Sequence, residues 1–251
     1  MPYELENRLV IGLASSALFN LEESDKVFRE QGELVYRDYQ RQHQNRPLAA
    51  GVAFPFIKRL LAILLSLCGM LVLSPLLLIL CLAIKIDSPG PIFFRQKRVG
   101  IHKQHFNILK FRTMRIDTPH DMPTHMLKDP DQYITRVGHF LRKTSLDELP
   151  QLWNIFVGDM AVIGPRPALW NQYDLLAERD KYHANDVRPG LTGWAQIHGR
   201  DELPIREKAE LDGYYVHHIA LGMDLECLCK TAGAVLRQDG IHEGMMENRW
   251  Q

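Results

Sequence analysis

An apolar segment from Leu60 to Ile84, interrupted at its centre by Ser74 and Pro75, constrains the fold of this chain more than any other feature. At 1.5 Å per residue, about 25 helical residues are long enough to cross a bilayer with some tilt. Pro75 removes a backbone donor and clashes with the preceding turn, so we expect a sharp bend there. Each half is then about 18 Å long, which is too short for a hydrocarbon core of roughly 30 Å.

Basic residues flank this segment on both sides, with Lys58 and Arg59 before it and Lys85 after it. Because cytoplasmic flanks of membrane helices are rich in lysine and arginine, we expect both ends on the cytoplasmic side. The sequence therefore favours a re-entrant helix-break-helix hairpin in one leaflet. A kinked spanning helix is the alternative, since proline also occurs in helices that cross membranes.

The formal net charge is zero, but the charge is unevenly distributed. A basic cluster follows the apolar segment and contains Lys85, Arg95, Lys97, Arg98, Lys103, Lys110, Arg112 and Arg115, with Asp87 as its one acidic residue. Such a cluster beside a membrane element indicates contact with lipid phosphates or with a phosphorylated substrate rather than with nucleic acid. The four cysteines lack the spacing of a disulfide framework or a zinc site, which favours reduced core thiols.

Three segments follow from these features: a soluble appendage over 1–52, the membrane element over 53–86 and a compact domain over 87–251. The expected fold class is α+β and mostly helical, with a small catalytic domain that carries interfacial amphipathic helices. Periodicity and turn residues predict a strand over 8–14, helices over 21–42, 205–215 and 221–236, a linker over 45–51, a hairpin over 92–112, a loop over 117–131, helical structure from 134 onwards, and turn-rich stretches over 164–167 and 188–197.

Two adjacent carboxylates, Asp147 and Glu148, stand at the expected start of a helix. In one interpretation, Ser145 and Glu148 simply form a capping box. In the other, the positive end of the helix dipole and the nearby Arg142 keep the carboxylates ionised and attract phosphate oxygens. Asp147 is then a candidate nucleophile on phosphorus, and Glu148 is a candidate ligand for a divalent metal.

Three further cations are candidate phosphate ligands. Lys110 and Arg112 flank one phenylalanine in an expected strand, so they share a face of it. Taken alone, two such residues more often lie on a solvated surface. Arg166 stands between two prolines, which fix its presentation; the alternative is a structural donor to backbone carbonyls.

Several blocks of sequence, taken together, carry a specific resemblance. They are Lys58-Arg59, Ser74-Pro75, and the stretches 89–100 (PGPIFFRQKRVG), 110–114 (KFRTM), 142–152 (RKTSLDELPQL), 158–160 (GDM), 164–167 (GPRP) and 189–196 (PGLTGWAQ). In order and spacing they resemble the small monotopic polyprenyl-phosphate phosphoglycosyl transferases of the bacterial sugar transferase family. The resemblance covers about three quarters of the chain.

This resemblance implies transfer of a sugar phosphate from a nucleotide diphosphate sugar, expected to be a UDP-sugar, to undecaprenyl phosphate, with release of UMP. It implies Mg²⁺ as cofactor and the cytoplasmic face of the bacterial inner membrane as location. Asp147 would form a covalent phosphosugar intermediate, and Glu148, with Asp147, would bind Mg²⁺.

The same resemblance implies roles for the cationic residues and for the break in the apolar segment. Lys110, Arg112 and Arg142 would bind phosphate, and Arg166 would contact the nucleotide end. Ser74 and Pro75 would form the re-entrant break. The sugar stays open, as does the formation of a homo-oligomer.

Residues 1–57 resemble instead the amino-terminal stretch of bacterial cytosolic 5'-nucleotidases. The downstream aspartate motif that supplies the nucleophile of those enzymes has no counterpart here, so no nucleotidase activity is expected. Two other functions compete with phosphoglycosyl transfer. One is a non-catalytic membrane scaffold that binds lipid phosphate or nucleotide, and the other is an ordinary glycosyltransferase that releases a nucleoside diphosphate.

Overall fold

The computed structural model describes residues 53–118, 130–199 and 203–237. The chain divides into two compact units, 1–47 and 48–251, and every described residue belongs to the second. The strand, helix and linker expected before residue 52, and most of the loop expected over 117–131, lie outside the described residues.

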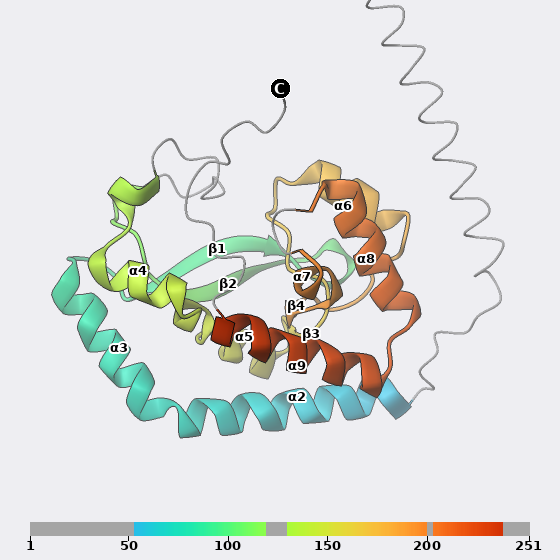
Figure 1. The fold of residues 1–251 in the computed structure, drawn as a ribbon, viewed down its shortest axis with the longest axis horizontal. Helices are drawn as coiled ribbons and strands as arrows, with labels where there is room; N and C mark the ends of the chain where they lie inside the picture. The colour runs from blue at the N-terminus through green and yellow to red at the C-terminus, as the bar shows by residue number, and fades with distance from the viewer. Residues whose placement is uncertain (1–52, 119–129, 200–202, 238–251) are drawn as a thin grey trace, which may run out of the picture. The chain divides into compact units, whose positions relative to one another are not determined.

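The apolar segment forms two helices, α2 (Ala53–Val72) and α3 (Ser74–Asp87), which meet at an angle (Figure 1). The break falls at the expected place. Pro75 has no N–H for the carbonyl of Leu71, and the Ser74 hydroxyl donates to that carbonyl at 2.8 Å instead. The serine thus satisfies the acceptor that the proline leaves open.

The prediction that each half is too short to cross a bilayer is wrong for α2. This helix begins at Ala53, well before the apolar run itself, and its 20 residues are about 30 Å long. Within the described residues, one helix is long and apolar enough to cross a membrane, and it is this one, over Phe54–Val72. Length therefore does not distinguish a hairpin from a kinked span.

The expected hairpin is confirmed, with β1 (Phe93–Val99) antiparallel to β2 (His105–Phe111). Both membrane-type helices pack against this ribbon. Phe111 is buried with Leu80 and Ile84 of α3, and Ile108 is buried with Ala62 of α2. The ribbon therefore connects α2 and α3 to the rest of the domain.

A second, parallel pair of strands was not expected from the sequence. β3 (Ala161–Ile163) pairs with β4 (Gly190–Thr192). β3 directly precedes the stretch 164–167, and β4 lies inside the stretch 188–197, both of which the sequence analysis treated as turn-rich. The strands approach closely because the chain has glycine there: a Cβ added to Gly190 would lie 2.1 Å from the backbone nitrogen of Gly164. Strands of three residues are too short to show alternation in the sequence.

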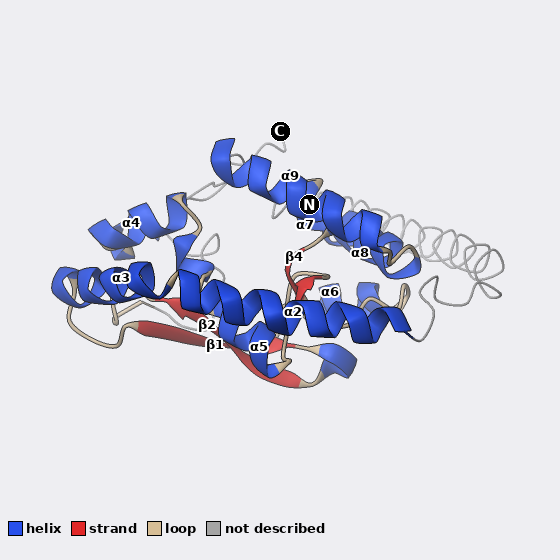
Figure 2. Cartoon of the chain, turned by 90° about the horizontal axis from the view of Figure 1, so that it is seen from below, coloured by secondary structure: helices blue, strands red, loops and turns tan. Residues whose placement is uncertain are grey.

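Helices surround the two strand pairs (Figures 1 and 2). They are α4 (Arg136–Lys143), α5 (Gln151–Val157), α6 (Tyr173–Asp180), α7 (Trp194–Ile197), α8 (Ile205–His217) and α9 (Leu221–Arg237), together with the 3₁₀ turns η1 (Ile101–Lys103), η3 (Pro130–Tyr133) and η4 (Leu146–Glu148). The two last helices confirm the helices expected over 205–215 and 221–236.

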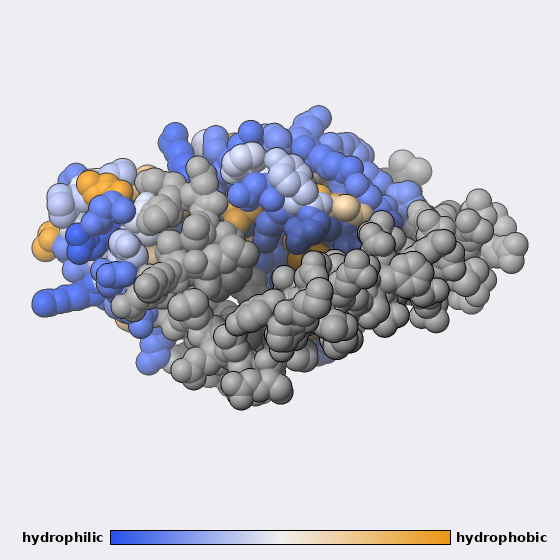
Figure 3. All heavy atoms as spheres, turned by 90° about the horizontal axis from the view of Figure 1, so that it is seen from above, coloured by the Kyte–Doolittle hydropathy of each residue, from blue (hydrophilic) through white to orange (hydrophobic). Residues whose placement is uncertain are grey.

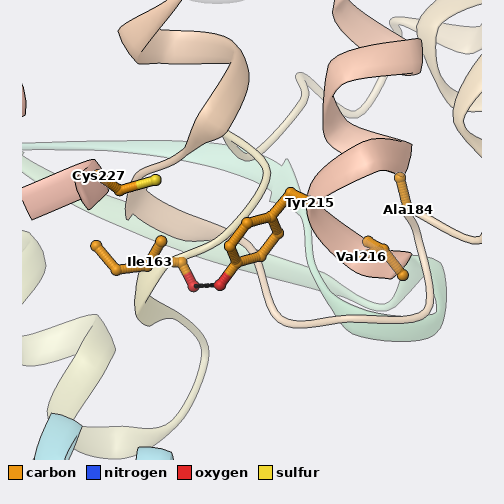
Figure 4. Close-up of a cluster of buried hydrophobic side chains, with 5 residues drawn as sticks. All are labelled: Ile163, Ala184, Tyr215, Val216 and Cys227. Carbon is orange, nitrogen blue, oxygen red and sulfur yellow. Dashed lines mark hydrogen bonds between the residues drawn. The ribbon is translucent and has the colours of Figure 1, made fainter. Parts of the chain in front are cut away.

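A buried cluster joins β3 to α8 and α9 (Figure 4). Tyr215 lies at its centre, and its hydroxyl donates to the Ile163 carbonyl at 3.2 Å and to Asp224 at 2.7 Å. Lys58 of α2 also hydrogen-bonds the Tyr215 hydroxyl, and its ammonium lies 2.9 Å from Asp224. The start of α2 is therefore tied to the strand β3.

The outward sides of α2 and α3 are apolar. Their exposed large side chains are Phe56, Ile57, Leu60, Leu61, Leu64, Leu65, Leu67, Leu71, Val72, Leu78, Ile79, Leu82 and Ile86. Seen from below, α2 lies between α5 and α9 (Figure 2), and these neighbours expose Trp153 and Leu225. From above, the described atoms in view are mostly hydrophilic (Figure 3).

The four cysteines are free thiols; Cys227 is buried and Cys81 is partly buried against a core cluster, as expected. Cys68 and Cys229 are exposed. The interpretation of all four as core thiols is therefore wrong for these two.

Candidate active site

Asp147 and Glu148 lie in the 3₁₀ turn η4, between α4 and α5. The capping-box interpretation of Ser145 and Glu148 is wrong, because Ser145 has a φ of 56° and its side chain makes no capping hydrogen bond. A three-residue turn also has little dipole of its own. The positive potential at the carboxylates comes instead from side chains of other elements.

Lys110 and Arg166 supply that potential. The Lys110 ammonium, near the end of β2, lies 2.7 Å from Glu148 Oε1 and 3.8 Å from Asp147 Oδ2. Arg166 Nη2 donates to the same Glu148 Oε1 at 3.0 Å. Glu148 is thus held by two cations, whereas Asp147 makes only a longer contact with one of them.

These unequal contacts separate the titration of the two carboxyls. Burial raises the pKa of a carboxyl, but Lys110 and Arg166 outweigh it and hold the pKa of Glu148 well below its usual range. For Asp147, burial prevails over the attraction of Lys110, and the neighbouring Glu148 adds to it, so the pKa is raised. Glu148 is therefore a fixed anion, and Asp147 is the carboxyl whose charge depends on its surroundings.

The loop that carries Arg166 is fixed by backbone contacts. Gly164 N–H donates to the Thr192 carbonyl at 2.9 Å, and Gly190 N–H donates to the Pro165 carbonyl at 2.9 Å. Both bonds join the end of β3 to β4, which begins 27 residues later in the chain. The unexpected strand pair is therefore what places Arg166 beside Glu148.

Arg142, in the last turn of α4, also belongs to this group. Its positive charge acts, with that of Lys110, against the rise that burial causes in the pKa of Asp147. Its Nε donates to the Thr113 hydroxyl at 2.9 Å, so Thr113 orients it. The sequence analysis did not single out Thr113, although it lies in the block 110–114.

Arg112 lies outside the cluster. Its guanidinium is buried, with 6% of the residue exposed, and donates to the Pro89 carbonyl at 2.6 Å and to the Ser88 carbonyl at 2.8 Å. It therefore fixes the turn between α3 and β1. The expectation that Lys110 and Arg112 act from one face is not met, because Arg112 lies beyond the end of β2.

Two other acidic residues are engaged in structural contacts. Asp159 accepts a hydrogen bond from Asn154 Nδ2 at 3.1 Å. Asp212 is buried and accepts both Nε and Nη2 of Arg179, at 2.8 and 2.6 Å. Neither is joined by a described contact to the Asp147–Glu148 pair.

Within the described ranges, no group of three or more His, Cys, Asp or Glu side chains is arranged to hold a metal ion. The site offers two carboxylates, Asp147 and Glu148. Magnesium is commonly held by one or two protein carboxylates, with substrate phosphates and water as its other ligands. The donor set therefore fits a metal that arrives with a diphosphate better than a resident metal cage.

Two family models match the chain. The model described as bacterial sugar transferase covers residues 53–238, which includes every element of the site. The model described as 5'-nucleotidase covers residues 1–69. It therefore reaches beyond residue 57 and into α2, where the two matches overlap.

Curated relatives cover the same region. An uncharacterized sugar transferase of Bacillus subtilis, EpsL, is 38% identical over 68% of this chain and 82% of its own length. A UDP-glucose:undecaprenyl-phosphate glucose-1-phosphate transferase of Xanthomonas campestris is 37% identical over 70% of this chain and 38% of its own length. A UDP-N-acetylgalactosamine-undecaprenyl-phosphate N-acetylgalactosaminephosphotransferase of Aeromonas hydrophila is 38% identical over 79% of this chain and 48% of its own length.

The match to these relatives is uneven in extent. The chain spans most of EpsL but less than half of the two proteins whose names state a substrate. The family model, in contrast, matches residues 53–238, about three quarters of the chain. By this match the chain belongs to the bacterial sugar transferase family.

Proposed function

We propose that this chain is a phosphoglycosyl transferase that moves a sugar 1-phosphate from a UDP-sugar to undecaprenyl phosphate and releases UMP. The observation that carries the proposal is the unequal pair of carboxylates. Glu148 is held between Lys110 and Arg166, while Asp147, beside it, has no contact closer than 3.8 Å to either cation. The relatives named for undecaprenyl-phosphate sugar phosphotransfer support the substrate class.

In the first step, an Asp147 carboxylate oxygen attacks the phosphorus next to the sugar. A new O–P bond forms, the bond to the bridging diphosphate oxygen breaks, and UMP leaves with that oxygen. Lys110, Arg142 and Arg166 surround the reacting phosphate with positive charge, which stabilises the negative charge on its oxygens. The sugar phosphate is then bonded to Asp147.

In the second step, an oxygen of undecaprenyl phosphate attacks the same phosphorus. The bond to Asp147 breaks, the carboxylate is regenerated, and the product is undecaprenyl diphosphate sugar. Because both steps transfer one phosphoryl group, the same cations serve in each. Lys110 and Arg142 bind phosphate oxygens, and Arg166 contacts the nucleotide end.

Magnesium is the cofactor we propose, with Asp147 and Glu148 as its protein ligands. When bound with the substrate, the ion supplies positive charge to the diphosphate and lowers the repulsion between it and the carboxylates. Glu148 suits this role because its pKa is held low and it stays anionic.

We further propose that α2 and α3 form a re-entrant hairpin at the cytoplasmic face of the bacterial inner membrane. The domain contacts α2 along its length, from Lys58 near its start to Gly69 near its end, where Leu152 lies within 3.3 Å of an added Cβ. It also contacts Leu80 and Ile84 on α3. A spanning helix leaves the domain at one end, whereas helices in contact throughout suit insertion from one side.

The test uses purified protein in nanodiscs with Mg²⁺, undecaprenyl phosphate and a panel of UDP-sugars. We expect lipid-dependent release of UMP from one donor, abolished by Asp147→Asn. Asp159→Asn is the matched control, because Asp159 is an acidic residue in the same domain that faces Asn154 instead of the cations. UDP as product would indicate ordinary glycosyl transfer, and no product from any donor would favour a scaffold.

The covalent step has its own test. Without the lipid acceptor, a donor labelled in the sugar should transfer label to the protein. Peptide mapping should place the label on Asp147. Stable labelling of any other residue, or none in a preparation that turns over, would contradict the intermediate.

A further inference from the structure

One buried amide nitrogen, three residues after Glu148 in the chain, has no hydrogen-bond partner among the described residues. Gln151 is 2% exposed, and within the described part of the chain its Nε2 has no acceptor. Buried polar groups in folded proteins nearly always have partners, so an exception calls for an explanation. The neighbouring buried amide, Asn154, shows the usual case.

Asn154 uses its whole side-chain amide within the protein. Its Oδ1 accepts Leu109 N–H at 2.9 Å, and its Nδ2 donates to the Asn107 carbonyl at 2.9 Å and to Asp159 at 3.1 Å. It thereby fastens α5 to the edge of β2. The Nε2 of Gln151, three residues earlier on the same helix, makes no such hydrogen bond within the described residues. A purely structural role therefore does not explain why an amide stands at this position.

The bounds of η4 and α5 relate the direction of Gln151 to that of the carboxylates. The chain turns by about 120° per residue through η4 and by about 100° per residue in α5. Gln151 therefore falls in the same sector as Asp147 and Glu148, one turn further on. Side chains on a helix lean toward its N-terminus, which directs Gln151 toward this pair.

We propose that Gln151 Nε2 donates a hydrogen bond to an oxygen of the phosphoryl group while that group is bonded to Asp147. This inference rests on the proposed function. The unpartnered atom is a donor, and the group that would arrive in this sector carries phosphoryl oxygens as acceptors. A neutral amide holds them without adding to the positive charge that Lys110 and Arg166 already provide, so it does not oppose the second transfer.

The experiment combines stability with turnover. Gln151→Met keeps the length of the side chain and removes the unpartnered donor. If the amide serves the substrate, the melting temperature should stay the same or rise, while kcat for UMP release should fall at least ten-fold, with a smaller change in KM for the UDP-sugar. Gln104→Met makes the same chemical change on an exposed side chain of the β1–β2 turn and should alter neither quantity.

Gln151→Glu provides a second variant. It keeps the shape of the side chain but replaces the donor by an acceptor that repels phosphate, so we expect a larger loss of kcat than with methionine. A methionine variant that folds and turns over within two-fold of wild type would overturn the inference. Unfolding of both variants would overturn it too, because the unpartnered Nε2 has no hydrogen bond to lose.

The proposed function can fail independently of this inference. In that case the wild type and Gln104→Met both release no UMP. Loss of UMP release in Gln151→Met alone, with release retained in wild type and Gln104→Met, is instead the result that concerns the amide.

Discussion

Two charged clusters in this domain use similar residues differently. Arg179 and Asp212 form a buried pair, 4% and 1% exposed at their side chains, in which two guanidinium nitrogens meet one carboxylate oxygen. In the cluster of Lys110, Arg166 and Glu148, two cations converge on one carboxylate while Asp147 stands beside it, less closely paired. The first cluster is complete without a ligand. The second has more positive charge than Glu148 needs, which is the arrangement that a phosphate requires.

The largest expected effect is a loss of activity, and it comes from a substitution in the cluster around Asp147 and Glu148. Asp147→Asn should reduce UMP release by at least about 10³-fold, because the amide is not a nucleophile. The fold should survive, since the substitution removes a carboxyl that burial makes costly to ionise. The rate of UMP release checks the loss of activity, and a chemical denaturation curve checks that the fold is retained. Retained turnover in a homogeneous sample would remove Asp147 from the reaction.

The next effect is a loss of stability, and it comes from a substitution in the Arg179–Asp212 pair. Asp212→Leu leaves the Arg179 guanidinium buried without its partner, so we expect a loss of about 3–5 kcal/mol in the free energy of unfolding. The double change Arg179→Met with Asp212→Leu should recover most of it, because no unpaired charge is left. If the single variant were as stable as wild type, the pair would not be the closed structural unit described above.

The pH dependence sharpens the contrast within the site. The attacking form of Asp147 is ionised, and its pKa is raised, so kcat/KM should fall with decreasing pH while still above about 3.9, the ordinary aspartate value. Lys110→Met removes the main charge that opposes this rise and should move the acid limb up by about one further unit. Lys97→Met, a neighbouring lysine stacked on Trp170, should leave the limb in place. An unmoved limb in Lys110→Met would contradict the assignment.

The smallest expected effect concerns a side chain that satisfies a backbone carbonyl rather than another charged side chain. Ser74→Ala removes the hydroxyl that donates to the Leu71 carbonyl next to Pro75. We expect it to lower the free energy of unfolding by about 1 kcal/mol in bilayer or detergent. Ser66→Ala is the control, because the Ser66 hydroxyl donates to a helical carbonyl, that of Ile63, which has a backbone donor available. Equal losses for both variants would mean that the proline leaves nothing for Ser74 to satisfy.

The sequence predicted those parts of the fold that have a strong local signal. The break at Ser74 and Pro75, the hairpin around Gly100 and the last two helices were each visible as a proline, a turn or a long periodic stretch. The strand pair β3–β4 was missed because its pairing depends on close contact between distant glycines, which no local pattern reports.

The site was predictable in its membership but not in its geometry. The blocks of the family resemblance contain Lys110, Arg142, Asp147, Glu148 and Arg166, and contacts or charge effects in the structure link all five. The same blocks contain Arg112, which serves a turn instead. A block match cannot separate a cation that faces a carboxylate from one that faces carbonyls, because that distinction is set by where the strand ends.

The hydrogen bonds around Tyr215 have a consequence for how the lipid bilayer acts on the protein. Lys58 joins α2 to Tyr215, and Tyr215 joins β3 at Ile163, three residues before Arg166. These hydrogen bonds connect α2 to the segment that carries Arg166, whose guanidinium faces Glu148. With α2 in the bilayer, as proposed above, we therefore expect the thickness and lateral pressure of the lipid to affect the position of Arg166 relative to Glu148.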